Sequence, residues 1–357
     1  MLNRPWNIYA EELFPLGYGH PLWYAEANFT TGRQVLVGDI GILHESQFRP
    51  LFNTLKPGDD PLNQGNVPDS FQPLALPSGI TRTDLLTQPI LVSEGITLQG
   101  ETNDPTAGHR WTFRSHADAG AVLVQDPPGV ADALDVRTAR PAIINYMREN
   151  LDAWRSPAYV QQSEIGDRDI LFVCGTVKTT RWGTAAVRDR DFRGREGRVS
   201  GDLAWSNNRA FYVEHVLWDY TMTGPLYRAG GPRPEGASQC LFMHYFKMKR
   251  FGAASGDDLV ESRGRPIRMG GYIVERCPST PPPEMDYDPV NCLLDYILKN
   301  SEAPFAAASD MDVTDLFRGQ PFPKLDQLPR AIKRASPRIE IDEHDVGTIS
   351  IAHAPVH

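Results

Sequence analysis

The hydrophobic positions along the chain predict two amphipathic helices. In residues 138–155 the apolar side chains recur at the helical spacing and charged residues occupy the opposite face, with Thr138 suited to the N-cap and Pro141 to the first turn. A second helix is predicted to begin after Asp288 as N-cap, with Pro289 at its first position. The apolar face of this second helix consists of Val290, Leu293, Leu294, Ile297 and Leu298.

Most other apolar stretches are short, rich in β-branched and aromatic residues, and bounded by glycine, proline or aspartate, which predicts strands. The predicted strand segments are RQVLVGDIGIL, PILVSEGITLQG, HRWTFRSHA, GAVLVQD, DILFVCGTV, GTAAVRD, RAFYVEHVLWDYTM, SQCLFMHYFKMKRF and GGYIVERC. Because helices do not alternate with these strands, we expect an α+β fold, with a mostly antiparallel β-rich body and a few packed helices.

Local turn signals predict two hairpins. One joins residues 109–117 to 120–126 through a turn near residues 118–120, and the other joins residues 170–177 to 184–187. Near the C-terminus we expect a short buried strand at residues 303–310, a short helix from Asp312 to Phe317, and an edge strand within residues 346–357.

The domain organisation predicted from these elements is a β-rich main body over residues 1–277. Residues 278–357 would form a proline-rich spacer, short helices and a tail packed on that body, making one domain overall.

Composition narrows the functional classes. Of the 357 residues, 41% are hydrophobic and 23% charged, which is typical of a globular protein. The net charge of −9 disfavours nucleic acid and anionic membranes as partners, and no apolar run reaches the roughly 20 residues of a membrane span. The arginine-rich run at residues 188–198 is interleaved with acids and does not change this expectation. The four cysteines form no CxxC pair, so we expect a reduced, cytoplasmic protein.

Common catalytic and cofactor motifs are absent from the sequence. There is no GxGxxG, GxxxxGK[ST], HExxH, GxSxG or EF-hand pattern, and we therefore expect no cofactor and no metal. His109 and His116 alone do not define a metal site. The acids Asp310, Asp312 and Asp315 fit helix capping better than magnesium binding.

A donor-rich stretch lies at the tip of the second predicted hairpin. If exposed, it would bind an anion or a sugar ring beside the face of a tryptophan. The commoner alternative is a solvated turn whose tryptophan folds back on the core. The residues of this stretch are Lys178, Thr179, Thr180, Arg181 and Trp182.

A possible catalytic set lies on two other predicted strands. His215 and Asp219 share one face of the first strand by the two-residue period, and Cys240 and His244 share one face of the second. If those faces met, imidazole could activate the thiol for a hydrolase or a transferase. Against this, aromatic residues occupy the face of Cys240, which is typical of an inert thiol and a core histidine.

Several segments also carry a resemblance. They are LFPLGYGHPLW, VLVGDIGIL, LFNTLKPGDDPLNQG, CGTVKTTRWGTAAV, SQCLFMHYFKMK and DPVNCLLDYILKNSEAPFAAASDMD. In this order they resemble segments of a large family of uncharacterised proteins in mushroom-forming fungi, the basidiomycetes. The resemblance implies a cytosolic protein of a many-copied family, which suits recognition or defence as readily as metabolism. It also implies an arginine within residues 243–245 and a small polar residue at His116, so neither His244 nor His116 would be a catalytic group throughout the family.

The sequence leaves two functional classes open. The first is a soluble intracellular binding or interaction protein for an unidentified small molecule, glycan or protein, with residues 178–182 as its exposed contact surface. The second is an enzyme, for example a hydrolase or transferase that uses Cys240, His215 or His244, and Asp219.

Overall fold

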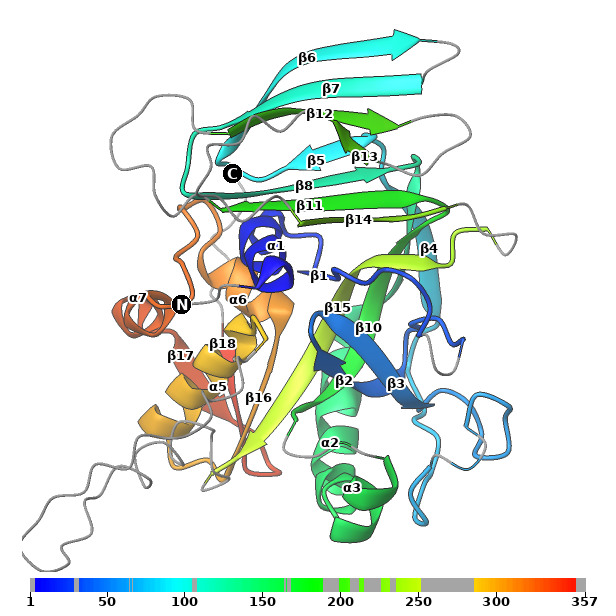
Figure 1. The fold of residues 1–357 in the computed structure, drawn as a ribbon. Coiled ribbons are helices and arrows are strands. Elements are labelled where there is room, and N and C mark those ends of the chain that lie inside the picture. Colours follow the sequence, from blue (N-terminus) through cyan, green and yellow to red (C-terminus); the bar gives the residue numbers. More distant parts are fainter. Residues whose placement is uncertain are drawn as a thin grey trace, which may run out of the picture.

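A large, mostly antiparallel sheet forms the centre of the molecule in the computed structural model (Figure 1), which describes residues 4–28, 32–63, 65, 67–104, 108–163, 165, 168–188, 199–205, 212–214, 226–231, 236–251 and 286–350. Its strand order is β17-β18-β16-β15-β10-β2-β3, with β1 also paired to β15 and β9 linking β10 to β4. Only the β16–β18 pairing is parallel among the described strands of this sheet. The strands are β1 His20–Pro21, β2 Asp39–His44, β3 Gln47–Asn53, β4 Ile80–Leu86, β9 Gly129–Leu134, β10 Ile170–Thr179, β15 Gln239–Arg250, β16 Phe305–Ser309, β17 Arg338–Ile341 and β18 Val346–Ser350.

Two smaller antiparallel sheets pack on each other to form a sandwich above the central sheet (Figure 1). Their strand orders are β14-β11-β8-β5 and β13-β12-β7-β6. Trp111 and Phe113 of one sheet pack with Val122 and Val124 of the other. The strands are β5 Ile90–Val92, β6 Ile96–Asp104, β7 Gly108–Ser115, β8 Ala119–Gln125, β11 Trp182–Arg188, β12 Val199–Trp205, β13 Tyr212–Glu214 and β14 Leu226–Gly230.

Helices cover both faces of the central sheet. α2 packs Met147 and Trp154 against Phe172 on one face, whereas α5, α6 and α7 contribute Leu293, Val313 and other apolar residues to a cluster on the opposite face. α1 lies between the central sheet and the sandwich (Figure 1). The helices are α1 Pro5–Leu13, the 3-10 helix η1 Phe14–Leu16, α2 Val136–Trp154, α3 Pro157–Ser163, α5 Pro289–Asn300, α6 Asp310–Leu316 and α7 Leu328–Ala335. None of the helices within the described residues is long and apolar enough to span a bilayer.

The fold class predicted from the sequence, α+β with a mostly antiparallel β-rich body, is confirmed. The helix predicted after Asp288 is also confirmed: the side chain of Asp288 accepts a 3.1 Å hydrogen bond from the Val290 N–H, and all five predicted face residues are buried. The earlier helix begins two residues before the predicted cap, because Asp135 caps it by accepting hydrogen bonds from the Arg137 N–H and the Thr138 hydroxyl.

Both predicted hairpins are wrong. β7 pairs with β6 and β12, whereas β8 pairs with β5 and β11. β10 pairs within the central sheet and β11 within the sandwich. The chain bends from one sheet into another at both places, and the alternation of residues within a strand does not distinguish such a bend from a hairpin turn.

Two predictions near the C-terminus need correction. β16 is buried throughout, as expected, but α6 begins at Asp310, before Asp312, because Ser309 provides the N-cap. β18 is an interior strand between β16 and β17, and β17 takes the sheet edge. The boundary at residue 277 lies outside the described residues.

Candidate functional site

The predicted contact surface at residues 178–182 forms a corner between the central sheet and the sandwich. Lys178 is 4% exposed, and Thr179 and Trp182 are fully buried. The expectation that this stretch projects into solvent is therefore wrong, because its two flanking strands belong to different sheets that close over it.

The side chains of Thr180, Arg181 and Trp182 are hydrogen-bonded to neighbouring residues. The Arg181 guanidinium pairs with Asp126, with Nη2 2.8 Å from Oδ1 and Nε 3.1 Å from Oδ2. The Thr180 hydroxyl donates to the same carboxylate at 3.2 Å, and the Trp182 indole N–H donates to Gln239 Oε1 at 2.8 Å. These contacts give Arg181 and Trp182 a structural role at the corner.

The predicted Cys–His–Asp set is not assembled among the described residues, and His215 and Asp219 lie outside them. Cys240 is 1% exposed, its thiol donates to the Phe242 carbonyl at 3.2 Å, and burial raises the pKa of Cys240 to about 12. Cys240 and His244 lie four residues apart on β15, which separates their Cα atoms by roughly 13 Å. Cys240 is thus a protonated core thiol and does not contact His244.

His244 instead pairs with a carboxylate from the start of α6. Its Nδ1 lies 2.7 Å from Asp310 Oδ2, and Asp310 Oδ1 accepts a 2.8 Å hydrogen bond from the Tyr245 N–H. The Asp310 side chain is 1% exposed, whereas that of His244 is 20% exposed. Burial lowers the pKa of His244, but the charge of Asp310 and its hydrogen bond raise the pKa more, so the net shift is upward.

His244 lies in a seam between two apolar clusters on its face of β15. Two residues earlier, Phe242 belongs to the cluster beneath α1 and the sandwich. Two residues later, Phe246 belongs to the cluster beneath α2. His244 belongs to neither cluster, which explains how a residue in the middle of an interior strand keeps part of its surface in solvent.

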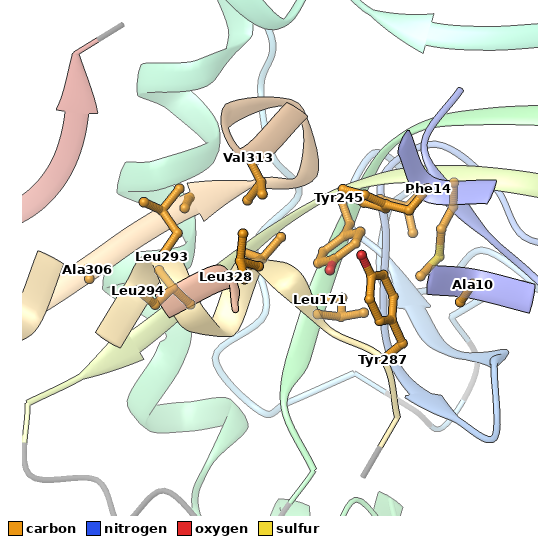
Figure 2. Packing of buried hydrophobic residues seen from close by; sticks show 14 of the residues in the cluster. Ala10, Phe14, Leu171, Tyr245, Tyr287, Leu293, Leu294, Ala306, Val313 and Leu328 are labelled. Carbon is orange, nitrogen blue, oxygen red and sulfur yellow. The ribbon is translucent and has the colours of Figure 1, made fainter. Parts of the chain in front are cut away.

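A second group of polar side chains is buried on the opposite side of β15. Lys247 is fully buried and binds the carboxylates of Asp288 and, at 2.6 Å, Asp169. The Tyr245 hydroxyl donates to Asp288 at 2.9 Å. Figure 2 shows Tyr245 and Tyr287 within the apolar cluster that surrounds this group.

His20 lies against this group and is 0% exposed. Neither of its ring nitrogens has a hydrogen-bond partner among the described residues. Sequence reasoning missed His20 completely and took Asp288 only as a helix cap. The one signal in the sequence was Lys247, a lysine between Phe246 and Met248 in a predicted strand.

A surface pocket of about 720 Å³ lies on the sandwich, beside strands β5 and β6. Tyr18 gives it partly exposed aromatic surface, Trp111 lies buried beneath it, and Gln88, Gln99 and Glu101 are exposed polar residues of its lining. β5 and β6 are each the last strand of their sheet, and β6 carries a bulge between Leu98 and Gly100. No sequence motif indicated this pocket.

The acids considered for magnesium have other partners. Asp312 forms a capping box with Ser309 and a two-pronged pair with Arg140, at 2.7 and 3.0 Å. Asp315 binds Arg318. Within the part of the chain that the structure describes, no group of three or more histidine, cysteine or acidic residues is placed to hold a metal ion.

Comparisons of the chain with protein-family models, with curated proteins and with solved structures find no match. The resemblance to a basidiomycete family therefore stays a prediction.

Proposed function

We propose that this chain is a soluble binding protein whose ligand is a neutral oligosaccharide, held in the pocket beside β5 and β6. The observation that carries the proposal is the lining of this pocket, which combines the partly exposed aromatic ring of Tyr18 with the exposed polar side chains of Gln88, Gln99 and Glu101. Aromatic surface packs against the C–H faces of a sugar ring, while amides and carboxylates exchange hydrogen bonds with its hydroxyl groups.

The position and charge of the pocket also support a neutral, hydroxyl-rich ligand. The outer backbone edges of β5 and β6 take no part in sheet pairing among the described strands, so they can add hydrogen bonds at the rim. Glu101 and the net charge of −9 disfavour anions such as phosphorylated or sulfated ligands. In the wider context we propose a cytoplasmic fungal protein of recognition or defence, a role that requires selective binding.

The test is a titration of the protein with neutral tetrasaccharides of β-1,3-glucan, chitin and cellulose. Binding is measured by calorimetry and by tryptophan fluorescence. We expect saturable binding of at least one of them. Glu101→Gln and Gln99→Ala should each weaken binding roughly 2- to 10-fold, the value of one hydrogen bond.

Gln320→Ala is the matched control, because Gln320 is an exposed amide in the loop after α6. Saturation by none of the three sugars, or equal affinities of the pocket variants and the control, would contradict the proposal. Binding of an extended peptide along β5 or β6 would show that the sheet edge, and not a sugar site, is the functional feature.

A further inference from the structure

His244 has the arrangement of a general base. One nitrogen of its ring, Nδ1, is held 2.7 Å from the buried Asp310 carboxylate. That contact fixes the ring orientation and places the Nδ1 proton toward Asp310, so that Nε2 carries the lone pair. No hydrogen bond to Nε2 occurs within the described residues, and the side chain keeps 20% of its surface exposed.

Glycines flank both sides of Nε2. A Cβ atom on Gly19 would lie 3.3 Å from His244 Cε1, and a Cβ atom on Gly175 would lie 3.2 Å from Cδ2. These are the two ring carbons bonded to Nε2. Gly19 directly precedes β1, and Gly175 is the β10 partner of His244 in the sheet register. Both glycines therefore bring backbone close against the ring, and a substrate would meet Nε2 through the 20% of the side-chain surface that stays exposed.

The groups around His244 leave water as the nucleophile. Burial raises the pKa of Cys174, from β10, well above its usual value, so this thiol stays protonated. Arg140 of α2 is held by both oxygens of Asp312, and His20 of β1 is buried and neutral. The carboxylate of Asp312 is thus occupied by Arg140, which leaves Asp310 as the carboxylate that binds the imidazole of His244.

We propose that His244 and Asp310 form a catalytic site that hydrolyses acyl esters by general-base activation of water. His244 Nε2 takes a proton from water as the water oxygen bonds to the acyl carbon. The resulting tetrahedral intermediate then breaks its bond to the alkoxide, and the imidazolium returns the proton to that oxygen, which yields an acid and an alcohol. An ester suits this site because an alkoxide departs far more readily than an amide anion, and the single proton on the imidazolium completes the alcohol.

The first experiment mixes the full chain with p-nitrophenyl acetate and measures the rate at which p-nitrophenol is released. We expect hydrolysis faster than by free imidazole at the same concentration, with a rate that rises with pH through a midpoint above 6.5, the ordinary pKa of histidine. His244→Gln should lower the rate at least 100-fold. His344→Gln, which removes an exposed histidine, should leave the rate unchanged.

Asp310→Asn tests whether the Asp310 carboxylate positions and charges the His244 ring or only fills space beside it. The loss of the carboxylate charge should lower the maximal rate and move the midpoint of the pH profile to lower pH, because the imidazolium loses its stabilising partner. A structural defect alone would lower the rate without this shift.

Chemical modification of the unaltered protein guards against variants that fail to fold. Diethyl pyrocarbonate acylates the free Nε2, and peptide mapping measures how far His244 has reacted. Hydrolysis should fall in parallel with this modification and return after hydroxylamine treatment. Hydrolysis no faster than free imidazole, full activity after complete modification of His244, or full activity in a folded His244→Gln protein would each overturn the proposal.

Discussion

The imidazole of His20 stacks on the ring of Tyr287 inside the protein, with ring centroids 6.2 Å apart and planes inclined by 28°. Phe14 and Tyr245 pack edge-on against the same imidazole. This aromatic enclosure accepts only the neutral ring: burial lowers the pKa of His20 to about 4, although the charges of Asp288 and Asp310 act in the opposite direction.

The burial of His20 predicts that the protein loses stability in acid. The unfolded chain takes up the proton near pH 6.5 and the folded chain only near pH 4. The contribution of His20 to the free energy of unfolding is therefore complete above pH 6.5 and falls by about 3 kcal/mol as the pH drops toward 4. Urea unfolding between pH 4 and pH 7.5 measures this change.

His20→Phe keeps an aromatic ring and removes the titration, so its stability should depend less on pH across the same window. His344→Phe is the control, because His344 is exposed and should follow the unaltered protein. Equal pH dependence of His20→Phe and the unaltered protein would contradict a neutral, buried His20.

Lys247 and Lys249 offer a matched comparison of a buried and a peripheral ion pair on one strand. Lys247→Met leaves Asp288 without its buried cation and should lower the free energy of unfolding by about 3–5 kcal/mol. Lys249→Met disrupts a more exposed pair with Asp295 and should cost at most about 1 kcal/mol. Chemical denaturation of both variants gives the comparison.

A second substitution identifies the cause of the Lys247 effect. Adding Asp288→Asn to Lys247→Met removes the stranded charge and keeps a residue suited to the N-cap of α5, so it should restore part of the lost stability. If Lys247→Met and Lys249→Met prove equally stable, the buried group is not held together by charge.

Gly230 and Gly231 test the corner formed by residues 178–182. A Cβ atom at Gly230 would collide with Trp182 Nε1 and Gln239 Oε1, two atoms that are hydrogen-bonded to each other at 2.8 Å. Gly230→Ala should therefore cost about 1–3 kcal/mol. At Gly231 a Cβ atom meets nothing within 4 Å, and Gly231→Ala should be close to neutral in a thermal melt. A neutral Gly230→Ala would mean that the corner is loosely packed.

The helix that begins at Pro289 shows what the sequence could reveal. Its N-cap and its apolar face both depend on residues close together in the sequence, so both could be predicted. Strand pairing is different, because β10 and β11 carry the alternation of a hairpin and yet pair with strands far away in the sequence. The sequence singled out His244 but assigned no role to Asp310 beyond helix capping, although the two residues meet.

The pairing of β15 with β16 explains why Asp310 could not be predicted as the partner of His244. Phe246 is opposite Ser309 in this register, which brings Asp310, the next residue, against Tyr245 and His244, the two residues that precede Phe246. No spacing within either segment specifies the register. His20 gave no signal at all, because it comes from a loop-like stretch and is buried by Phe14, by Tyr245 of β15 and by Tyr287 of the segment before α5.

The two sheets of the sandwich have corresponding strand orders, and the chain crosses directly between them at residues 93–95 and 116–118. Opening one sheet therefore pulls on strands whose continuations belong to the other, and it exposes the apolar layer that both share. In amide hydrogen exchange, the two sheets should consequently open as one cooperative unit with a single free energy, distinct from that of the central sheet.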